Sequence, residues 1–181
     1  MTKPGAIARA SVRYGRALEA LAMVGFALLL AMMLIIVADV ALRNLAIPGW
    51  PQGLAWSNEV SELMLYLMTM CVAPWLLRQG QHIRVDILLQ ALPKRLAWAL
   101  EGIGDMIGLA CCLVIAWVGA GSAWSSYLAG SVNIKTLVPP EWWSLAPLPI
   151  AFVLLAIEML FRMHRLWQGE RAPRSGAVSA A

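Results

Sequence analysis

Charged side chains are scarce in this sequence. Asp, Glu, Lys and Arg make up 13% of its 181 residues, whereas they make up roughly a quarter of an average soluble domain. Hydrophobic residues make up 61%, and a soluble domain is nearer to half apolar. This composition disfavours a soluble protein and predicts an integral membrane protein.

Cysteine and histidine are also rare. Cys71, Cys111 and Cys112 lie in apolar stretches without the spacing of a zinc site, so we interpret them as small buried hydrophobic residues. Haem held by two imidazoles needs histidines on facing helices, whereas His82 and His164 are predicted near a membrane boundary. This placement disfavours haem, and we keep a haem-binding anchor of an electron-transfer complex only as the alternative function. We expect no cofactor, no metal site and no catalytic residue, and thus no enzyme.

Four segments lack charged residues altogether, namely 20–38, 63–77, 106–134 and 142–157. A bilayer core of about 30 Å needs about 20 helical residues, so the second and fourth segments need a flanking turn. That turn brings Glu59 and Glu62, or Glu158, towards the membrane edge. The sequence predicts an all-α integral membrane protein with transmembrane helices over 18–43, 57–77, 95–124 and 143–166.

The basic residues are distributed unevenly around these helices. Of the 14 Lys and Arg, four lie in each of three segments: the N-terminal tail, the 78–97 loop and the C-terminal end. Only Arg43 and Lys135 lie elsewhere. The positive-inside rule then places both termini in the cytoplasm. Basic residues that flank membrane helices face anionic lipid, so no nucleic-acid partner is expected.

The predicted transmembrane helices divide the chain into three parts. Residues 1–16 are predicted to form a basic cytoplasmic tail, 17–168 the four-helix domain, and 169–181 a disordered tail that is small and polar. Residues 84–92 carry apolar side chains at helical spacing and end before Pro93. They are too few to span a bilayer, so they predict an interfacial helix on the cytoplasmic side between the second and third helices.

The stretch "LLRQGQHIRVDILL", residues 76–89, places a histidine four residues before an acid. A catalytic pair is one interpretation. The predicted topology favours another, in which Arg78 and Arg84 meet lipid headgroups and Asp86 lies in the first turn of the interfacial helix, where an acid suits the helix dipole. His82 would then hydrogen-bond to Asp86 or to a neighbouring helix end.

Charges also gather at the predicted outer ends of the first two helices. Asp39 and Arg43 are four residues apart, and Glu59 and Glu62 three apart, so each pair shares a helix face. An ion or substrate site is one interpretation, but transport sites lie near the membrane midplane. We therefore favour a structural contact between Arg43 and Glu59, or an anchor to another subunit. Trp56, near the same boundary, suits an aromatic belt.

Glu101 and Asp105 are four residues apart at the inner start of the third helix, where Arg78, Arg84 or Arg95 could balance their charge.

Gly104 and Gly108 form a small-xxx-small pattern in the third helix, which lets another helix approach closely. The sequence has no internal repeat and no polar cluster at the midplane, whereas secondary transporters are built from repeats around such a site. The chain is therefore predicted to be an accessory membrane subunit. A small exporter that works as a homodimer stays open as an alternative.

Three segments resemble the small membrane subunit of tripartite ATP-independent periplasmic (TRAP) transporters. They are "VADVALRNL" with Arg43, "WSNEVSELMLYL" with Trp56 and Glu59, and "RQGQHIRVDILL" with Arg78 and His82. The order and spacing of these segments agree with the family over residues 15–168. The chain departs from the family at Asn44, where an aromatic residue is common, and at Pro74, where small residues are usual.

The resemblance implies a non-catalytic subunit of a sodium-coupled importer of organic acids in the bacterial inner membrane. A large membrane subunit would carry the substrate and sodium sites, and a periplasmic binding protein would deliver the substrate transiently. The small subunit would form a tight complex with the large one and brace it in the lipid.

Overall fold

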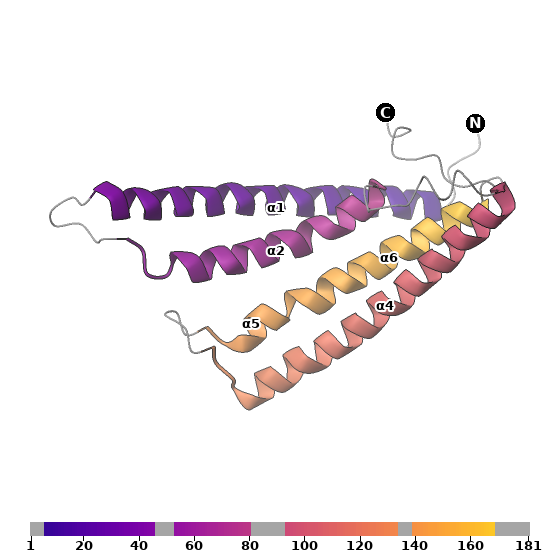
Figure 1. Ribbon diagram of the computed structural model, residues 1–181. Coiled ribbons are helices and arrows are strands. Elements are labelled where there is room, and N and C mark those ends of the chain that lie inside the picture. The colour runs from indigo at the N-terminus through magenta and orange to yellow at the C-terminus, as the bar shows by residue number, and fades with distance from the viewer. Residues whose placement is uncertain (1–5, 46–52, 81–92, 134–138, 169–181) are drawn as a thin grey trace.

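The computed structural model describes residues 6–45, 53–80, 93–133 and 139–168 (Figure 1). These residues form four long helices and one short one. The helices are α1 (Ala6–Leu45), α2 (Ser57–Arg78), α4 (Lys94–Ala129), α5 (Glu141–Leu145) and α6 (Pro147–Gln168). The predicted all-helical protein with four helices long and apolar enough to cross a membrane is confirmed. α1 begins at Ala6, inside the segment predicted to be a tail.

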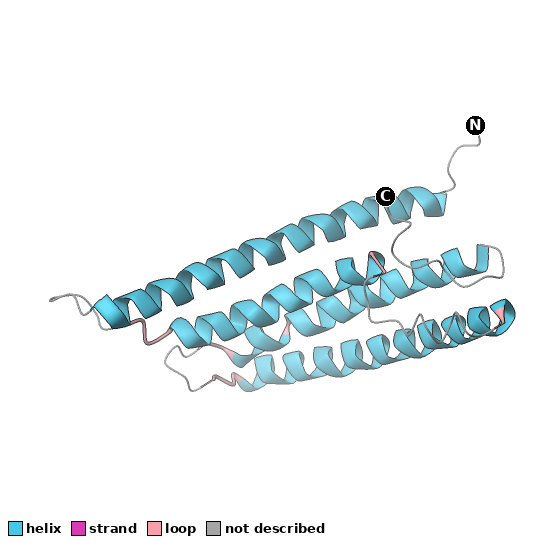
Figure 2. Ribbon diagram, turned by 45° about the horizontal axis from the view of Figure 1, so that its top comes forward, coloured by secondary structure: helices cyan, strands magenta, loops and turns pink. Residues whose placement is uncertain are grey.

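The long helices form two antiparallel hairpins, α1 with α2 and α4 with α6. α2 packs on α6 and joins the hairpins, so α1 and α4 lie on the outside of the row (Figure 2). The hairpins converge where α1 begins and α6 ends, and they diverge towards the opposite end (Figure 1). We call these the narrow end and the wide end of the protein.

Small residues set the packing of the first hairpin. The buried stripe of α1 consists of Gly15, Leu18, Ala22 and Gly25, spaced three and four residues apart, as one face of a helix requires. At Gly25 an added Cβ would lie 2.5 Å from Val72 Cγ2 of α2. The two helices therefore approach as closely as a missing side chain allows.

Proline and glycine end the helices of the second hairpin. α4 ends at Ala129 and is capped by Gly130, whose φ of +62° is a left-handed conformation that glycine adopts without steric penalty. The predicted fourth span consists of two helices, because α5 ends at Leu145 and α6 begins at Pro147. Proline lacks the backbone N–H that would continue α5. An isolated bridge between Val132 and Pro140 closes the turn between α4 and α5.

Little of the membrane-crossing surface is buried within the chain itself. Only 11–17% of the most apolar window of each spanning helix is buried. A small core of Leu77, Cys112, Leu155 and Ala156 joins α2, α4 and α6. Cys71 is half-buried and Cys111 is exposed, so the prediction of three buried cysteines is right for Cys112 alone. Most of the apolar surface is left for lipid or another protein.

Candidate functional site

The most deeply buried charge is Glu158, in the second half of α6, with 0% of its side chain exposed. Arg78, the last residue of α2, donates from Nη1 to Glu158 Oε2 at 3.1 Å. Its Nη2 donates to the backbone oxygen of Ser11 in α1 at 3.0 Å. Arg165, further along α6, donates to Glu158 Oε1. One guanidinium group thus joins three helices at the narrow end.

The local sequence of α1 makes room for this cluster. An added Cβ at Gly15 would lie 2.8 Å from the Arg78 guanidinium, so a larger residue would displace it. One residue earlier, the Tyr14 hydroxyl donates to the backbone oxygen of Leu154 in α6 at 2.6 Å. The Tyr14 ring packs against Phe161, with 5.6 Å between ring centroids. At this end α1 therefore contacts α6 of the second hairpin as well as α2, its partner in the first.

This cluster corrects one expectation from the sequence and adds to another. Arg78 was predicted to meet lipid headgroups, but its guanidinium binds Glu158 and is only 22% exposed. Glu158 was predicted at the membrane edge, which stays a prediction, but its enclosure between helices was not foreseen. A buried carboxylate needs a charged or hydrogen-bonding partner, so an acid in the last span is a signal to search for a basic residue on another helix.

A second ion pair joins α4 to α6 near the narrow end. Arg162 Nε lies 3.1 Å from Asp105 Oδ1, and both side chains are largely buried. The indole N–H of Trp98 donates to the backbone oxygen of Leu166 at 3.3 Å. The sequence suggested Arg78, Arg84 or Arg95 as partners of Asp105, and Arg162 was missed. Glu101, one turn earlier on α4, is also buried.

At the wide end, Asp39 organises the turn between α1 and α2. Asp39 Oδ2 accepts from Arg43 Nε at 2.9 Å, and Asp39 Oδ1 accepts from the backbone N–H of Leu54 at 2.6 Å. Gly53 in this turn has a φ of +107°. Because it has no side chain, the backbone of the turn can lie close to the Arg43 side chain. The Arg43 guanidinium thus pairs with Asp39 of the same helix, and the predicted contact between Arg43 and Glu59 stays a prediction.

We expect Asp39→Ala to lower the midpoint temperature of unfolding about twice as far as Arg43→Ala. The reason is that the Asp39 carboxylate accepts from both the guanidinium and the turn, whereas Arg43→Ala removes only one of these hydrogen bonds. Thermal unfolding of the full chain in detergent, followed by circular dichroism, measures both. Equal shifts for the two variants would contradict an organising role for Asp39 in the turn.

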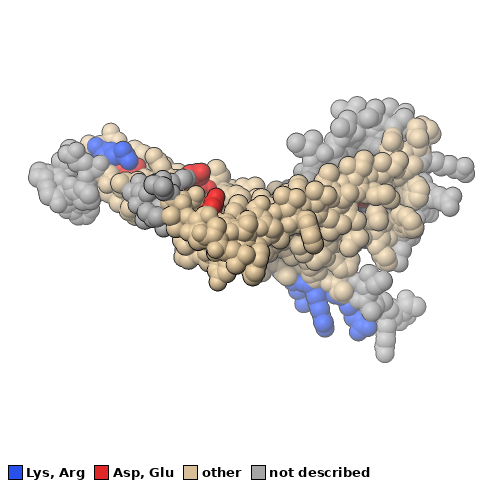
Figure 3. All heavy atoms as spheres, turned by 90° about the horizontal axis from the view of Figure 1, so that it is seen from below, with Lys and Arg blue, Asp and Glu red and all other residues tan. Residues whose placement is uncertain are grey.

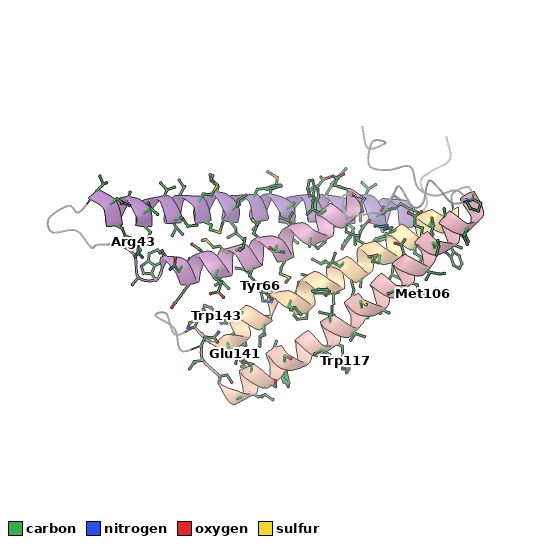
Figure 4. The ribbon with its side chains drawn as sticks, in the orientation of Figure 1. Arg43, Tyr66, Met106, Trp117, Glu141 and Trp143 are labelled. Carbon is green, nitrogen blue, oxygen red and sulfur yellow. The ribbon has the colours of Figure 1, made fainter. Side chains whose placement is uncertain are left out.

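Glu59 and Glu62 lie on the face of α2 that looks towards α5 and α6. Both line a cavity of about 740 Å³ between the hairpins at the wide end, together with Tyr66 and Trp143. Figure 4 shows Tyr66 and Trp143 on the two sides of the gap between α2 and α5. Glu59 is thus on the side of α2 opposite Ser57, which is buried next to Asp39.

The remaining predicted residues are scattered. Trp56 is partly exposed directly before α2. An added Cβ at Gly108 would lie 2.9 Å from Met159 Cε of α6, whereas nothing lies within 4 Å of one at Gly104. The pattern therefore marks a close approach at Gly108 alone. His82, Arg84, Asp86 and the interfacial helix over 84–92 lie outside the described residues, so the structure tests neither the expected cytoplasmic helix nor the haem alternative.

The family model of the DctQ component of tripartite ATP-independent periplasmic transporters matches residues 32–169. The chain belongs to this family. The match covers the wide-end turn, the α2–α6 contact and the complete second hairpin. A search of curated proteins gave no match.

This DctQ-family protein is the small membrane component of a TRAP transporter, and its four spanning helices make it a multi-pass protein of the inner membrane. The family implies a tripartite system with a large membrane subunit and a binding protein. Of the ion pairs described above, Arg78–Glu158 and Arg162–Asp105 join two helices, and the other two lie within one helix. No group of three metal-binding side chains occurs within the described ranges.

Proposed function

We propose that the chain is a non-catalytic brace for the large subunit of a sodium-coupled, binding-protein-dependent importer of organic acids. Its membership in the DctQ family supports the assembly, and the resemblance over residues 15–168 supports the substrate class and the coupling ion. In this proposal the sodium and substrate sites belong to the large subunit.

The observation that carries the bracing role is the burial of Glu158 between two arginines at the narrow end. This cluster ties α2 to α6, and Arg78 extends it to α1. A buried ion pair has a strict geometry, because separating its partners leaves an uncompensated charge in a dry environment. The hairpins are thus held together while most of their apolar surface stays open to a partner.

We further propose that the narrow end faces the cytoplasm. Of the described arginines, Arg9, Arg13, Arg16 and Arg165 lie towards this end and Arg43 lies at the wide end. Basic residues are retained on the cytoplasmic side of membranes. Figure 3 shows Lys and Arg atoms on the underside towards this end, and Asp and Glu atoms together with a further group of Lys and Arg atoms towards the wide end. Both termini would then be cytoplasmic, because α1 begins and α6 ends there.

Co-expression with the large permease subunit of the same transporter tests this proposal. We expect the two subunits to co-purify, and we expect sodium-driven uptake of the organic acid to fall to background without this chain. In the same cells, a cysteine introduced at Leu45 should react with an impermeant thiol reagent from outside, and one introduced at Gln168 should not. Uptake that persists after deletion, with no co-purification, would refute the brace. Reversed labelling would refute the orientation.

A further inference from the structure

Trp117 of α4 is the most exposed of the large hydrophobic side chains in the described part of the chain, with 84% of its surface uncovered. It lies midway between Asp105 and Ala129, about 18 Å along the helix from each. Because α4 crosses the membrane over these residues, the ring lies near the middle of the bilayer core. Figure 4 shows Trp117 on the side of α4 that faces away from α6.

A tryptophan at this depth is poorly solvated by lipid. Among the described residues no acceptor bonds to the Trp117 indole N–H, and acyl chains offer none. Tryptophan therefore concentrates at the membrane–water boundaries, where its N–H reaches water or headgroups. A second protein that covers the ring and brings an acceptor to the N–H accounts for this placement, whereas lipid does not.

Trp117 belongs to a continuous exposed stripe along α4. The members of the stripe follow each other in steps of four and three residues, the spacing at which one helix packs along another at a small crossing angle. They are Ile103, Ile107, Ala110, Val114, Trp117, Gly121, Trp124 and Leu128, and all eight are exposed. The stripe extends about 38 Å and crosses a bilayer core of about 30 Å, so a whole spanning helix can lie against it.

The stripe is also large enough for a stable contact. Its exposed side-chain surface amounts to roughly 600 Å², if a tryptophan offers about 200 Å² and an aliphatic side chain about 100 Å². A standard protein interface buries about 800 Å² on each partner. One helix laid along the stripe would therefore form most of an interface of standard size.

The other outer helix, α1, offers a different surface. The exposed side chains in its middle are aliphatic, as at Leu30, Leu34 and Val37, and α1 contains no tryptophan. Lipid tails solvate aliphatic side chains as well as a protein does. The outer face of α1 therefore suits lipid, and the outer face of α4 suits a protein.

A second copy of this chain fits the stripe poorly. Two copies inserted in the same orientation pair their α4 helices in parallel about a two-fold axis, so each residue of the stripe lies opposite its own copy. The two Trp117 rings would collide, and Gly121 would face Gly121 across a gap. A different helix can place a small residue against Trp117 and a large one against Gly121, where nothing lies within 4 Å of an added Cβ.

We propose that this stripe of α4 binds a membrane-spanning helix of the large subunit, with Trp117 at the centre of the contact. The docking of α4 rests on the proposed function, in which the large subunit lies beside this chain in the same membrane. The partner helix has a small residue and a hydrogen-bond acceptor near the Trp117 ring, and a large apolar residue near Gly121. The outer face of α1 is left in contact with lipid.

Photocrosslinking in the assembled transporter locates the contact. A photoreactive phenylalanine derivative replaces Val114 of α4 or, as the matched control, Leu34 of α1, because both side chains are 62% exposed. Each full-length variant is co-expressed with the large subunit and illuminated in the membrane. We expect the yield of crosslinks to the large subunit to be at least several-fold higher from position 114 than from position 34.

Substitutions in the stripe measure its importance for assembly. Nothing lies within 4 Å of an added Cβ at Gly121 or Gly104, and only Gly121 belongs to the stripe. Gly121→Leu should reduce the amount of large subunit that co-purifies by about tenfold, as a change at the centre of an interface does. Gly104→Leu should leave it unchanged. Thermal unfolding of the isolated chain should show neither variant to be less stable than the wild type.

Removal of the central ring provides a second comparison. Trp117→Ala should reduce co-purification as Gly121→Leu does. Trp167→Ala removes an exposed ring from the last turn of α6, away from the stripe, and should leave co-purification unchanged.

Three results would overturn the docking of α4. The first is a crosslink yield from position 34 that equals or exceeds the yield from position 114. The second is a crosslink from position 114 to a second copy of this chain in place of the large subunit. The third is unchanged co-purification in both Gly121→Leu and Trp117→Ala. In all three the wild-type subunits still co-purify, so the docking surface is refuted while the proposed function stands. Wild-type subunits that never co-purify would refute both.

Discussion

Glu158→Gln is expected to destabilise the folded protein by about 2–4 kcal/mol. The substitution keeps the size of the side chain but removes the negative charge that faces Arg78 and Arg165. Loss of one partner of a buried ion pair leaves the other charge uncompensated, which is why such changes cost about 3–5 kcal/mol in fully dry sites. We expect somewhat less, because both arginines retain partial exposure. Unfolding of the full chain in mixed micelles measures the change.

Two comparisons separate this effect from a general loss of charge. Glu19→Gln removes an exposed carboxylate from α1 and should leave stability within about 0.5 kcal/mol of the wild type. Glu158→Met combined with Arg78→Met should be less destabilising than Glu158→Met alone, because the double variant no longer strands the Arg78 charge. If the double variant shows the sum of the two single losses, then the pair does not couple the hairpins.

The elements of the fold were predictable because hydropathy is a local property. Each spanning helix is a run of neighbouring apolar residues, so the sequence locates it without knowledge of the rest of the chain. The division of the last span into α5 and α6 was not predicted, although Pro147 and Pro149 lie there. Proline marks a possible break, but whether the helix kinks or ends depends on the packing around it.

The contacts of the candidate site were far less predictable. Arg78 and Glu158 are 80 residues apart, and no periodicity relates them. The pairing follows from the order of the helices, in which α2 lies against α6. Asp39 and Arg43 are instead close in the sequence, so their pairing was easier to predict. Their spacing of four placed them on one face, yet the sequence did not show that Leu54 would bind the same carboxylate.

The glycines also show that a local sequence pattern does not fix the contact that the fold makes. Gly104 and Gly108 match a known packing pattern, but only Gly108 meets another helix. Gly25, which fits no such pattern, lies at a closer contact. Its role is visible only when the buried stripe of α1 is set beside α2. Local patterns therefore indicate where a close approach is possible, and the partner helix decides where it occurs.

Gly25→Leu is expected to be the most damaging substitution in the first hairpin. A Cβ at this position would lie 2.5 Å from Val72 Cγ2 and 3.5 Å from both Cys71 Cβ and the Met68 backbone oxygen. Valine is branched at Cβ and has few alternative rotamers, so it cannot move aside without shifting α2. Overpacking of this kind destabilises by about 1–3 kcal/mol, and we expect the upper part of that range in the same unfolding assay.

Gly121→Leu is the matched control, because nothing lies within 4 Å of a Cβ at Gly121 in α4. Both variants gain up to about 1 kcal/mol from the higher helix propensity of leucine, so their difference isolates the steric effect. Gly121→Leu should be neutral or slightly stabilising. If Gly25→Leu is equally neutral, α1 and α2 do not need close contact at this position, and the hairpin must be held by its two ends, at Asp39 and at Arg78.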